Sequence, residues 1–216
     1  IFWRHLEKLI AAVFCLVLLF ELSSCAVNTK SAEQTGFSMG SLVGIKLYGK
    51  NSEALENANL LAEVVKTDER ISKNYVGSDI YRVNSSGEHG ETVSSETYDE
   101  LRTVCDVYSD SHGKAAVLSG ALTELWGFDT DEFRLPSEDE ILSAKEKCGD
   151  DKLIFDDGKK VYIPDGAKLN LGSAGKGIAL DEAVKRIDEI NSQGGKITGA
   201  VISVGGSVAT YGLPKK

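Results

Sequence analysis

The turn Gly172-Ser173-Ala174-Gly175-Lys176-Gly177 is the segment of this sequence best suited to bind an anion. Small residues let backbone N–H groups approach a ligand, and the helix expected after the turn adds its positive end. Lys176 adds a full charge. The spacing is not that of a P-loop, because Gly177 stands where a magnesium-binding Ser or Thr belongs, nor of a Rossmann turn, because Leu180 takes the third glycine position. A tight strand-to-helix turn without a ligand is the alternative interpretation.

Other kinds of site have little support in the sequence. His89 and His112 are the histidines beyond the N-terminal segment, and neither lies in a nucleophile motif, which argues against a Ser-His-Asp hydrolase. The sequence has no CxxC or HExxH motif, so a structural zinc site is not expected. The net charge is −9 and no Lys/Arg cluster follows a helix face, so we expect no nucleic-acid partner.

Two cysteines belong to the folded part of the chain. Cys105 lies on an apolar helical stripe with Leu101 and Tyr108, which favours a buried core thiol. A single disulfide between Cys105 and Cys148 is the alternative, and it would require an oxidising compartment.

The first 25 residues resemble a bacterial lipoprotein signal. A basic start precedes the apolar run Leu9 to Phe20, which is too short to cross a bilayer and is typical of a secretory signal. The small residues Ser23 and Ser24 lead directly to Cys25. The sequence therefore predicts a signal peptide over 1–24 and a lipid on Cys25 that anchors the protein on the extracytoplasmic side of the membrane. An uncleaved N-terminal anchor is the alternative.

The glycine-rich turn belongs to a domain that follows a polar segment. Residues 25–36, including the lipidated cysteine, are predicted to form a flexible tether, and residues 37–216 a folded domain. Apolar periodicity and capping boxes predict strands at 43–47 and 200–204 and helices at 53–69, from Thr97, at 137–147 and after Gly177. Residues 74–94 are predicted to be loops. The segments 152–155 and 160–163 flank Asp157-Gly158 as a β-hairpin, so we expect an α+β fold with helices packed on mixed sheets.

Five segments occur in an order that resembles the ApbE family, the FAD:protein FMN transferases. They are Met39-Gly40-Ser41, the segment Ser78 to Asn84, the segment Gly120 to Phe128, the segment Leu169 to Gly177, and the segment Val201 to Gly206. The series covers nearly all of the chain after the signal. Many family members are lipoproteins, which agrees with Cys25.

The resemblance implies an enzyme that binds FAD and Mg²⁺. Family members transfer the FMN half of FAD onto a Thr or Ser hydroxyl of a partner protein and release AMP. This is phosphoryl transfer, in which a metal offsets charge on the diphosphate. The expected partner is a flavoprotein of an extracytoplasmic electron-transfer system.

The resemblance also implies the residues of the site. By motif, the residues expected to contact the flavin nucleotide are Met39, Asn74, Lys114, Ala115, Ala116, Asn170 and Lys176. The backbone carbonyl of Ser173 is expected to be a magnesium ligand. The remaining ligands of the family, an Asp and a Thr, are expected beyond Lys216. The start at Ile1 and the end just behind an apolar strand indicate a piece of a longer product.

Several positions depart from the family pattern. Asp is usual where this sequence has Ala116 and Asn170, and an aromatic residue is usual at Asn74, where neighbouring Tyr75 could substitute. A single carbonyl cannot hold a cation that takes about six oxygen ligands, so the printed chain alone is expected to have little transferase activity. The alternatives are an FAD hydrolase, a non-catalytic flavin-binding lipoprotein, and a solute-binding lipoprotein without flavin affinity.

Overall fold

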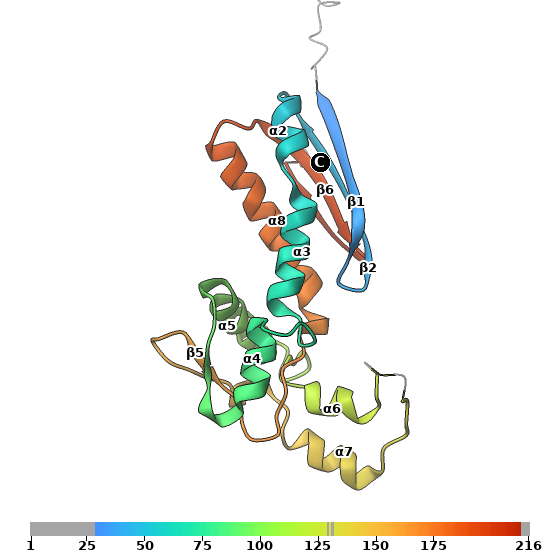
Figure 1. Ribbon diagram of the computed structural model, residues 1–216, viewed down its shortest axis with the longest axis vertical. Coiled ribbons are helices and arrows are strands. Elements are labelled where there is room, and N and C mark those ends of the chain that lie inside the picture. The colour runs from blue at the N-terminus through green and yellow to red at the C-terminus, as the bar shows by residue number, and fades with distance from the viewer. Residues whose placement is uncertain (1–28, 129, 131, 213–216) are drawn as a thin grey trace, which may run out of the picture.

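A four-stranded antiparallel sheet forms the upper part of the fold in Figure 1. The computed structural model describes residues 29–128, 130 and 132–212. The strand order is β1-β2-β6-β7. The strands are β1 (Lys30–Ser38), β2 (Ser41–Gly49), β6 (Ile197–Val204) and β7 (Ser207–Tyr211).

Three helices pack on one face of this sheet: α2 (Ser52–Asn57), α3 (Leu60–Ile71) and α8 (Gly175–Ser192) (Figure 1). Alternate residues of the two central strands face these helices, as the period of two in a strand requires. The buried set includes Val43, Ile45, Leu47, Leu60, Val64, Ala183, Ile187, Ala200, Ile202 and Val204. The predicted strands at 43–47 and 200–204 and the helix after Gly177 are confirmed.

Two predictions in this part are wrong. The helix expected over 53–69 is broken, because Asn59 has a left-handed backbone with φ 47° that separates α2 from α3. Asparagine accepts this conformation more readily than most residues. The tether expected up to residue 36 is a strand from Lys30 onward, because its backbone pairs with β2 along the whole of β1. The signal and Cys25 lie outside the described residues.

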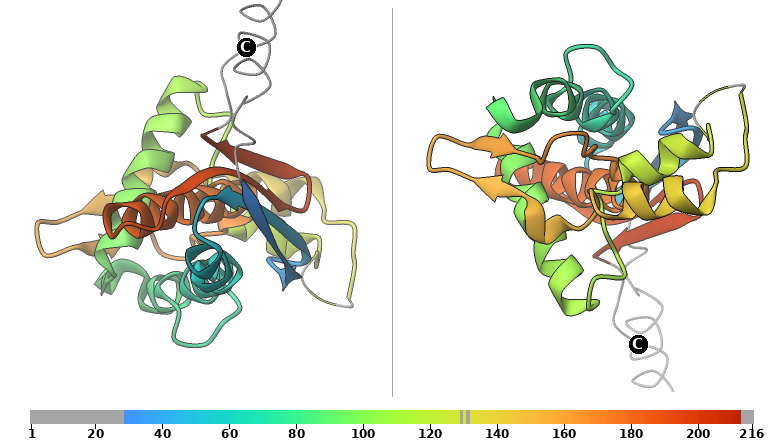
Figure 2. Two further views of the ribbon diagram at one scale, coloured as in Figure 1. Left: turned by 90° about the horizontal axis from the view of Figure 1, so that it is seen from above. Right: turned by 90° about the horizontal axis from the view of Figure 1, so that it is seen from below.

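A second group of elements forms the lower part of Figure 1. Its helices are α4 (Asp79–Ser86), η1 (Gly87–His89), α5 (Ser95–Asp110), α6 (Gly120–Leu125), α7 (Glu138–Lys145), η2 (Asp150–Lys152) and η3 (Leu171–Ser173). A small sheet has the order β3-β5-β4, formed by β3 (Glu91–Thr92), β4 (Ile154–Phe155) and β5 (Lys160–Tyr162). Figure 2 shows the β4–β5 hairpin and the α6–α7 pair on opposite sides of α8.

This part has its own buried core, which includes Ile80, Val83, Leu101, Leu118, Val161 and Leu169. The predicted hairpin around Asp157-Gly158 is confirmed, and so is the capping box of Ser137 at the start of α7. The α+β class is confirmed, but the described strand pairs are all antiparallel rather than mixed.

The loops predicted over 74–94 are partly wrong. Residues 79–86 form α4, whose first turn is capped by the Ser78 side chain, 2.9 Å from the Tyr81 backbone nitrogen. This helix is too short for its apolar spacing to stand out in the sequence. The next helix, α5, begins at Ser95 with Ser94 as its cap rather than at Thr97, because the Ser94 hydroxyl accepts from the Thr97 N–H.

Cys105 and Cys148 are both free thiols and partly buried. Cys105 packs against the lower core, and burial raises its pKa to about 11. The core-thiol interpretation of Cys105 is therefore confirmed and the disulfide is not formed. Within the described ranges, no helix combines the length and the apolar character that a membrane span requires.

Asp79 links α4 to the start of α5, and its ionisation makes the stability of the fold depend on pH. Its carboxylate accepts bonds from the Ser94 N–H at 3.0 Å, the Ser94 hydroxyl at 2.6 Å and the Arg82 guanidinium at 2.8 Å. Burial would raise the pKa of Asp79, but these bonds and one from Thr97 outweigh it and lower the pKa. The stabilisation is therefore present above the unfolded pKa of about 4 and lost as pH falls through the folded value.

We expect Asp79→Asn to lower the free energy of unfolding by about 1–3 kcal/mol near pH 7 and to matter less below about pH 4. Urea unfolding followed by circular dichroism at both pH values measures this. The exposed Asp106, replaced by Asn, is the matched control. An equal loss at both pH values would contradict the ionic role assigned to Asp79.

Candidate functional site

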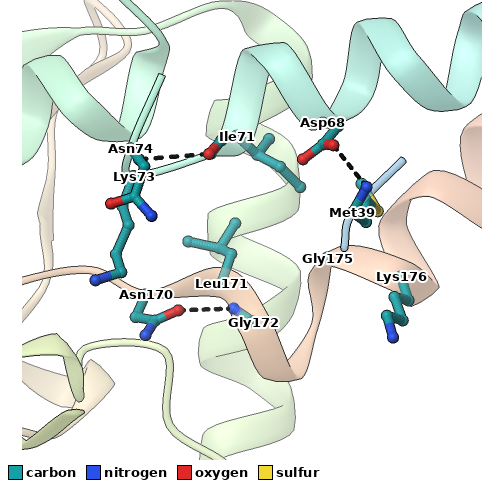
Figure 3. Close-up of a pocket in the computed structure, with 11 residues that line it drawn as sticks. Met39, Asp68, Ile71, Lys73, Asn74, Asn170, Leu171, Gly172, Gly175 and Lys176 are labelled. Atoms are coloured by element: carbon teal, nitrogen blue, oxygen red, sulfur yellow. Dashed lines mark hydrogen bonds between the residues drawn. The ribbon is translucent and has the colours of Figure 1, made fainter. Parts of the chain in front are cut away.

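A cavity of about 170 Å³ lies where the two parts of the fold meet (Figure 3). Its walls come from the β1–β2 turn, the end of α3 with the loop behind it, and the glycine-rich turn before α8. The lining residues are Met39, Asp68, Ile71, Ser72, Lys73, Asn74, Asn170, Leu171, Gly172, Gly175 and Lys176. Segments far apart in the sequence thus form one pocket.

The glycine-rich turn is held by the side chain of Asn170. Its Oδ1 accepts from the Gly172 N–H at 3.0 Å, and its Nδ2 donates to Thr123 Oγ1 of α6 at 3.1 Å. The Asn170 N–H also donates to the Val117 carbonyl at 2.8 Å. The amide at this position therefore serves the loop itself and ties it to α6, the helix of the Gly120 to Phe128 segment.

Lys176 reaches from the first turn of α8 to the β1–β2 hairpin. Its Nζ donates to Ser41 Oγ at 2.8 Å. Gly205 has φ +60°, and a Cβ built there would lie 2.8 Å from Lys176 Nζ and 2.9 Å from Ser41 Oγ. Since a side chain at Gly205 would crowd this contact, glycine is the residue that fits. Three of the five segments thus meet at Lys176.

The segment Ser78 to Asn84 supports the same turn from behind. The Asn84 amide brackets Leu169, with Nδ2 donating to the Leu169 carbonyl at 2.9 Å and Oδ1 accepting from its N–H at 2.7 Å. Lys168 Nζ also donates to the Asn84 carbonyl at 2.7 Å. The second segment therefore fixes the chain that enters the glycine-rich turn.

The structure brings four of the expected residues to the pocket and leaves four outside its lining. Met39, Asn74, Asn170 and Lys176 line it, whereas Lys114, Ala115, Ala116 and Ser173 do not. The 114–116 stretch is connected to the glycine-rich turn only through the next residue, Val117, whose carbonyl accepts from the Asn170 N–H. Tyr75, the suggested substitute for an aromatic residue, is 51% exposed and outside the lining.

Five further residues line the pocket that the motifs did not single out: Asp68, Ile71, Ser72, Lys73 and Leu171. Asp68 and Ile71 are three apart on α3 and share a face, so their helical spacing was the available signal. Nothing in the sequence indicated that this face meets the hairpin turn.

A magnesium ion does not fit the described residues alone. Asp68 is the one carboxylate among the lining residues, and its Oδ2 already accepts two hydrogen bonds. In the described ranges, no group of three His, Cys, Asp or Glu side chains could hold a metal. Magnesium takes about six oxygen ligands, so Asp68 and the Ser173 carbonyl are too few.

Comparisons with known proteins agree on one family. Residues 39–216 match the ApbE family. The FAD:protein FMN transferase of Haemophilus influenzae is 21% identical over 96% of this chain and 62% of its own length. The ApbE protein of Thermotoga maritima has a TM-score of 0.75 and 26% identity, covering 86% of this chain and 60% of that one.

The apo flavinyl transferase ApbE of Pseudomonas stutzeri has a TM-score of 0.72 and 23% identity, covering 84% of this chain and 58% of that one. The chain therefore spans about three fifths of the length of these relatives. The matched region includes all five segments, of which two line the pocket and three contact the glycine-rich segment, and the chain belongs to the ApbE family.

Proposed function

We propose that this chain binds FAD and takes part in transferring its FMN half to a Thr or Ser hydroxyl of an acceptor protein. The observation that carries the proposal is a pocket lined by two of the family segments, with Lys176 at the start of α8 and the other three segments in contact with the glycine-rich segment. The names of the relatives support the reaction type. In this reaction the hydroxyl oxygen forms a bond to the FMN phosphorus, the phosphoanhydride bond breaks, AMP leaves, and the hydroxyl proton passes to solvent.

The residues of this chain would bind and orient the dinucleotide. The small residues of the glycine-rich turn let an anion approach the start of α8, and this helix, with 18 residues, directs its positive end there. Lys176 would offset phosphate charge. Met39, Ile71 and Leu171 supply an apolar surface for a planar ring.

Magnesium dependence is part of the proposal through the family resemblance. The ion would offset charge on the diphosphate when bound. Because the described residues do not fit it, most of its ligands would have to come from outside them.

Export and a lipid on Cys25 complete the proposal, motivated by the N-terminal pattern. Strand β1 begins at Lys30, five residues after Cys25. A fully extended segment of that length spans at most about 17 Å, so the domain would sit close to the membrane surface. An acceptor protein on the extracytoplasmic side would meet it there.

Incubation of the full chain with FAD, Mg²⁺ and an acceptor domain tests the reaction. Covalently flavinylated acceptor with an equal amount of AMP supports transfer, whereas AMP without labelled acceptor supports an FAD hydrolase. The Haemophilus influenzae relative run in parallel is the positive control. Absence of any flavin binding in an isothermal titration would end the proposal.

A non-catalytic flavin-binding protein is the second candidate, favoured by Ala116 and Asn170. It predicts FAD binding without AMP release. In that case, Ala116→Asp combined with Asn170→Asp should raise the rate of AMP release. After Asn170→Asp the side chain could still accept from the Gly172 N–H. The Thr123 hydroxyl, which donates to the Gly120 carbonyl at 2.9 Å, would have to turn toward the new carboxylate to keep the second contact.

A further inference from the structure

The turn that carries Met39 into the pocket has a backbone conformation that disfavours methionine. Met39 has φ 51° and Gly40 has φ 64°, so both residues of this two-residue hairpin loop are left-handed. Hairpin loops of this type prefer Asn or Asp followed by Gly, because a Cβ opposes positive φ. Something outside the hairpin must therefore hold Met39 in place.

Asp68 of α3 holds the turn at one end. Its Oδ2 accepts hydrogen bonds from the Met39 N–H at 2.6 Å and from Ser38 Oγ at 2.9 Å (Figure 3 shows the first). Ser38 is only 6% exposed, so its hydroxyl needs a partner inside the protein. Bonds to an ionised acceptor are about twice as strong as neutral ones.

Lys176 holds the other end of the same turn through Ser41, as described above. The turn is thus fixed from both sides by charged residues that themselves line the pocket. Among the lining residues of the described chain, Asp68 is the acidic one.

Met39 is also where the two cores of the fold meet. Its side chain is packed against the upper core and against the lower core. A shift of the turn would therefore move Met39 relative to both Ile71 and Leu171, the other large apolar residues of the pocket. The position of this turn decides the shape of the apolar wall.

We infer that Asp68 is a positioning residue for flavin-nucleotide binding, acting through Met39. The inference rests on the proposed function, because it assigns Asp68 to the same pocket. Asp68 fixes the left-handed turn by two hydrogen bonds, and the turn in turn places the Met39 side chain against the ligand. The role requires an oxygen acceptor on residue 68, and the negative charge of Asp68 only strengthens the two bonds.

The first test is fluorescence titration of the full chain with FMN and with FAD. Asp68→Ala should weaken binding about tenfold, whereas Asp68→Asn should stay within about threefold of the original chain because its amide oxygen can still accept. Glu69→Gln is the matched control, an exposed carboxylate on the same helix, and should change nothing. Equal binding by Asp68→Ala and the original chain would overturn the inference.

A double-mutant cycle with Met39→Ala separates positioning from general stability. If Asp68 acts through Met39, then Asp68→Ala should weaken binding by less than about twofold in the Met39→Ala background. An unchanged tenfold effect there would overturn the inference. Thermal unfolding of each variant identifies a temperature at which all variants are folded, and the titrations are done at that temperature.

Ser38→Ala provides a milder variant in case Asp68→Ala does not fold. It removes one of the two bonds and should weaken binding about threefold, with no effect in the Met39→Ala background. No flavin binding by the original chain would overturn the proposed function itself. Flavin binding that is insensitive to both Asp68→Ala and Ser38→Ala would overturn only the role of Asp68.

Discussion

Replacing Lys176 with alanine is expected to weaken FAD binding by about 10- to 100-fold, the range for losing hydrogen bonds to a charged group. The lysine lies in the first turn of α8, beside the glycine-rich turn, where backbone N–H groups and the helix dipole already favour an anion. Its removal would leave the phosphate charge without its full counter-charge.

The comparison of three ligands makes this prediction specific. Lys176→Ala should weaken binding of FAD and FMN strongly and binding of riboflavin, which has no phosphate, by less than about threefold. Lys185→Ala on the same helix is the control, because Lys185 is exposed and pairs only with Glu182 at 3.5 Å within the described chain. Calorimetric titration gives the affinities. An equal loss for riboflavin would mean that Lys176 acts by holding Ser41 and not by binding phosphate.

Replacing Glu100 with alanine is expected to lower the free energy of unfolding by about 3–5 kcal/mol. Glu100 of α5 forms a two-pronged ion pair with Arg70 of α3, both contacts being 2.6 Å, and the Arg70 and Glu100 side chains are only 15% and 13% exposed. Arg70 also donates to Thr97 Oγ1 at 2.7 Å. Without Glu100 the guanidinium would be left buried with one neutral partner.

Urea unfolding of the full chain measures the loss. Asp106→Ala, an exposed carboxylate on the same helix, should change stability by less than about 0.5 kcal/mol. The pair Arg70→Met with Glu100→Leu should recover much of the stability, because apolar residues can replace a buried ion pair without leaving an unpaired charge. If Glu100→Ala lowers the free energy of unfolding by no more than Asp106→Ala does, the Arg70–Glu100 ion pair does not hold α3 to α5.

The Arg70–Glu100 ion pair also affects the position of residues that line the pocket. Arg70 is two residues from Asp68 on the same short helix, and α3 supplies Asp68 and Ile71 to the cavity. A loosened α3 would displace both lining residues. We therefore expect flavin affinity to fall with stability in the Glu100→Ala variant, which the titration used for Lys176 would detect.

The parts of the fold that the sequence predicted correctly depend on neighbours in the chain. The capping box at Ser137 was evident from residues three apart, and the β4–β5 hairpin from the Asp157-Gly158 turn between two short apolar runs. Most of the buried residues of β2 and β6 are alternate residues along each strand, as a period of two predicts. The order of the five segments likewise pointed to the glycine-rich turn and Lys176, which line one pocket in the structure.

Contacts between distant segments determine which other residues surround the pocket. Strand β1 forms because β2 offers it a partner along its whole length, although its own sequence is polar enough to suggest a tether. Asp68 is separated from Met39 by 29 residues, and their contact exists only because α3 packs across the hairpin. Periodicity reports which face of an element is buried, but not which turn of a distant hairpin that face will meet. The local elements and the glycine-rich turn thus follow from neighbouring residues in the chain, whereas long-range packing sets the shape and the remaining lining residues of the pocket.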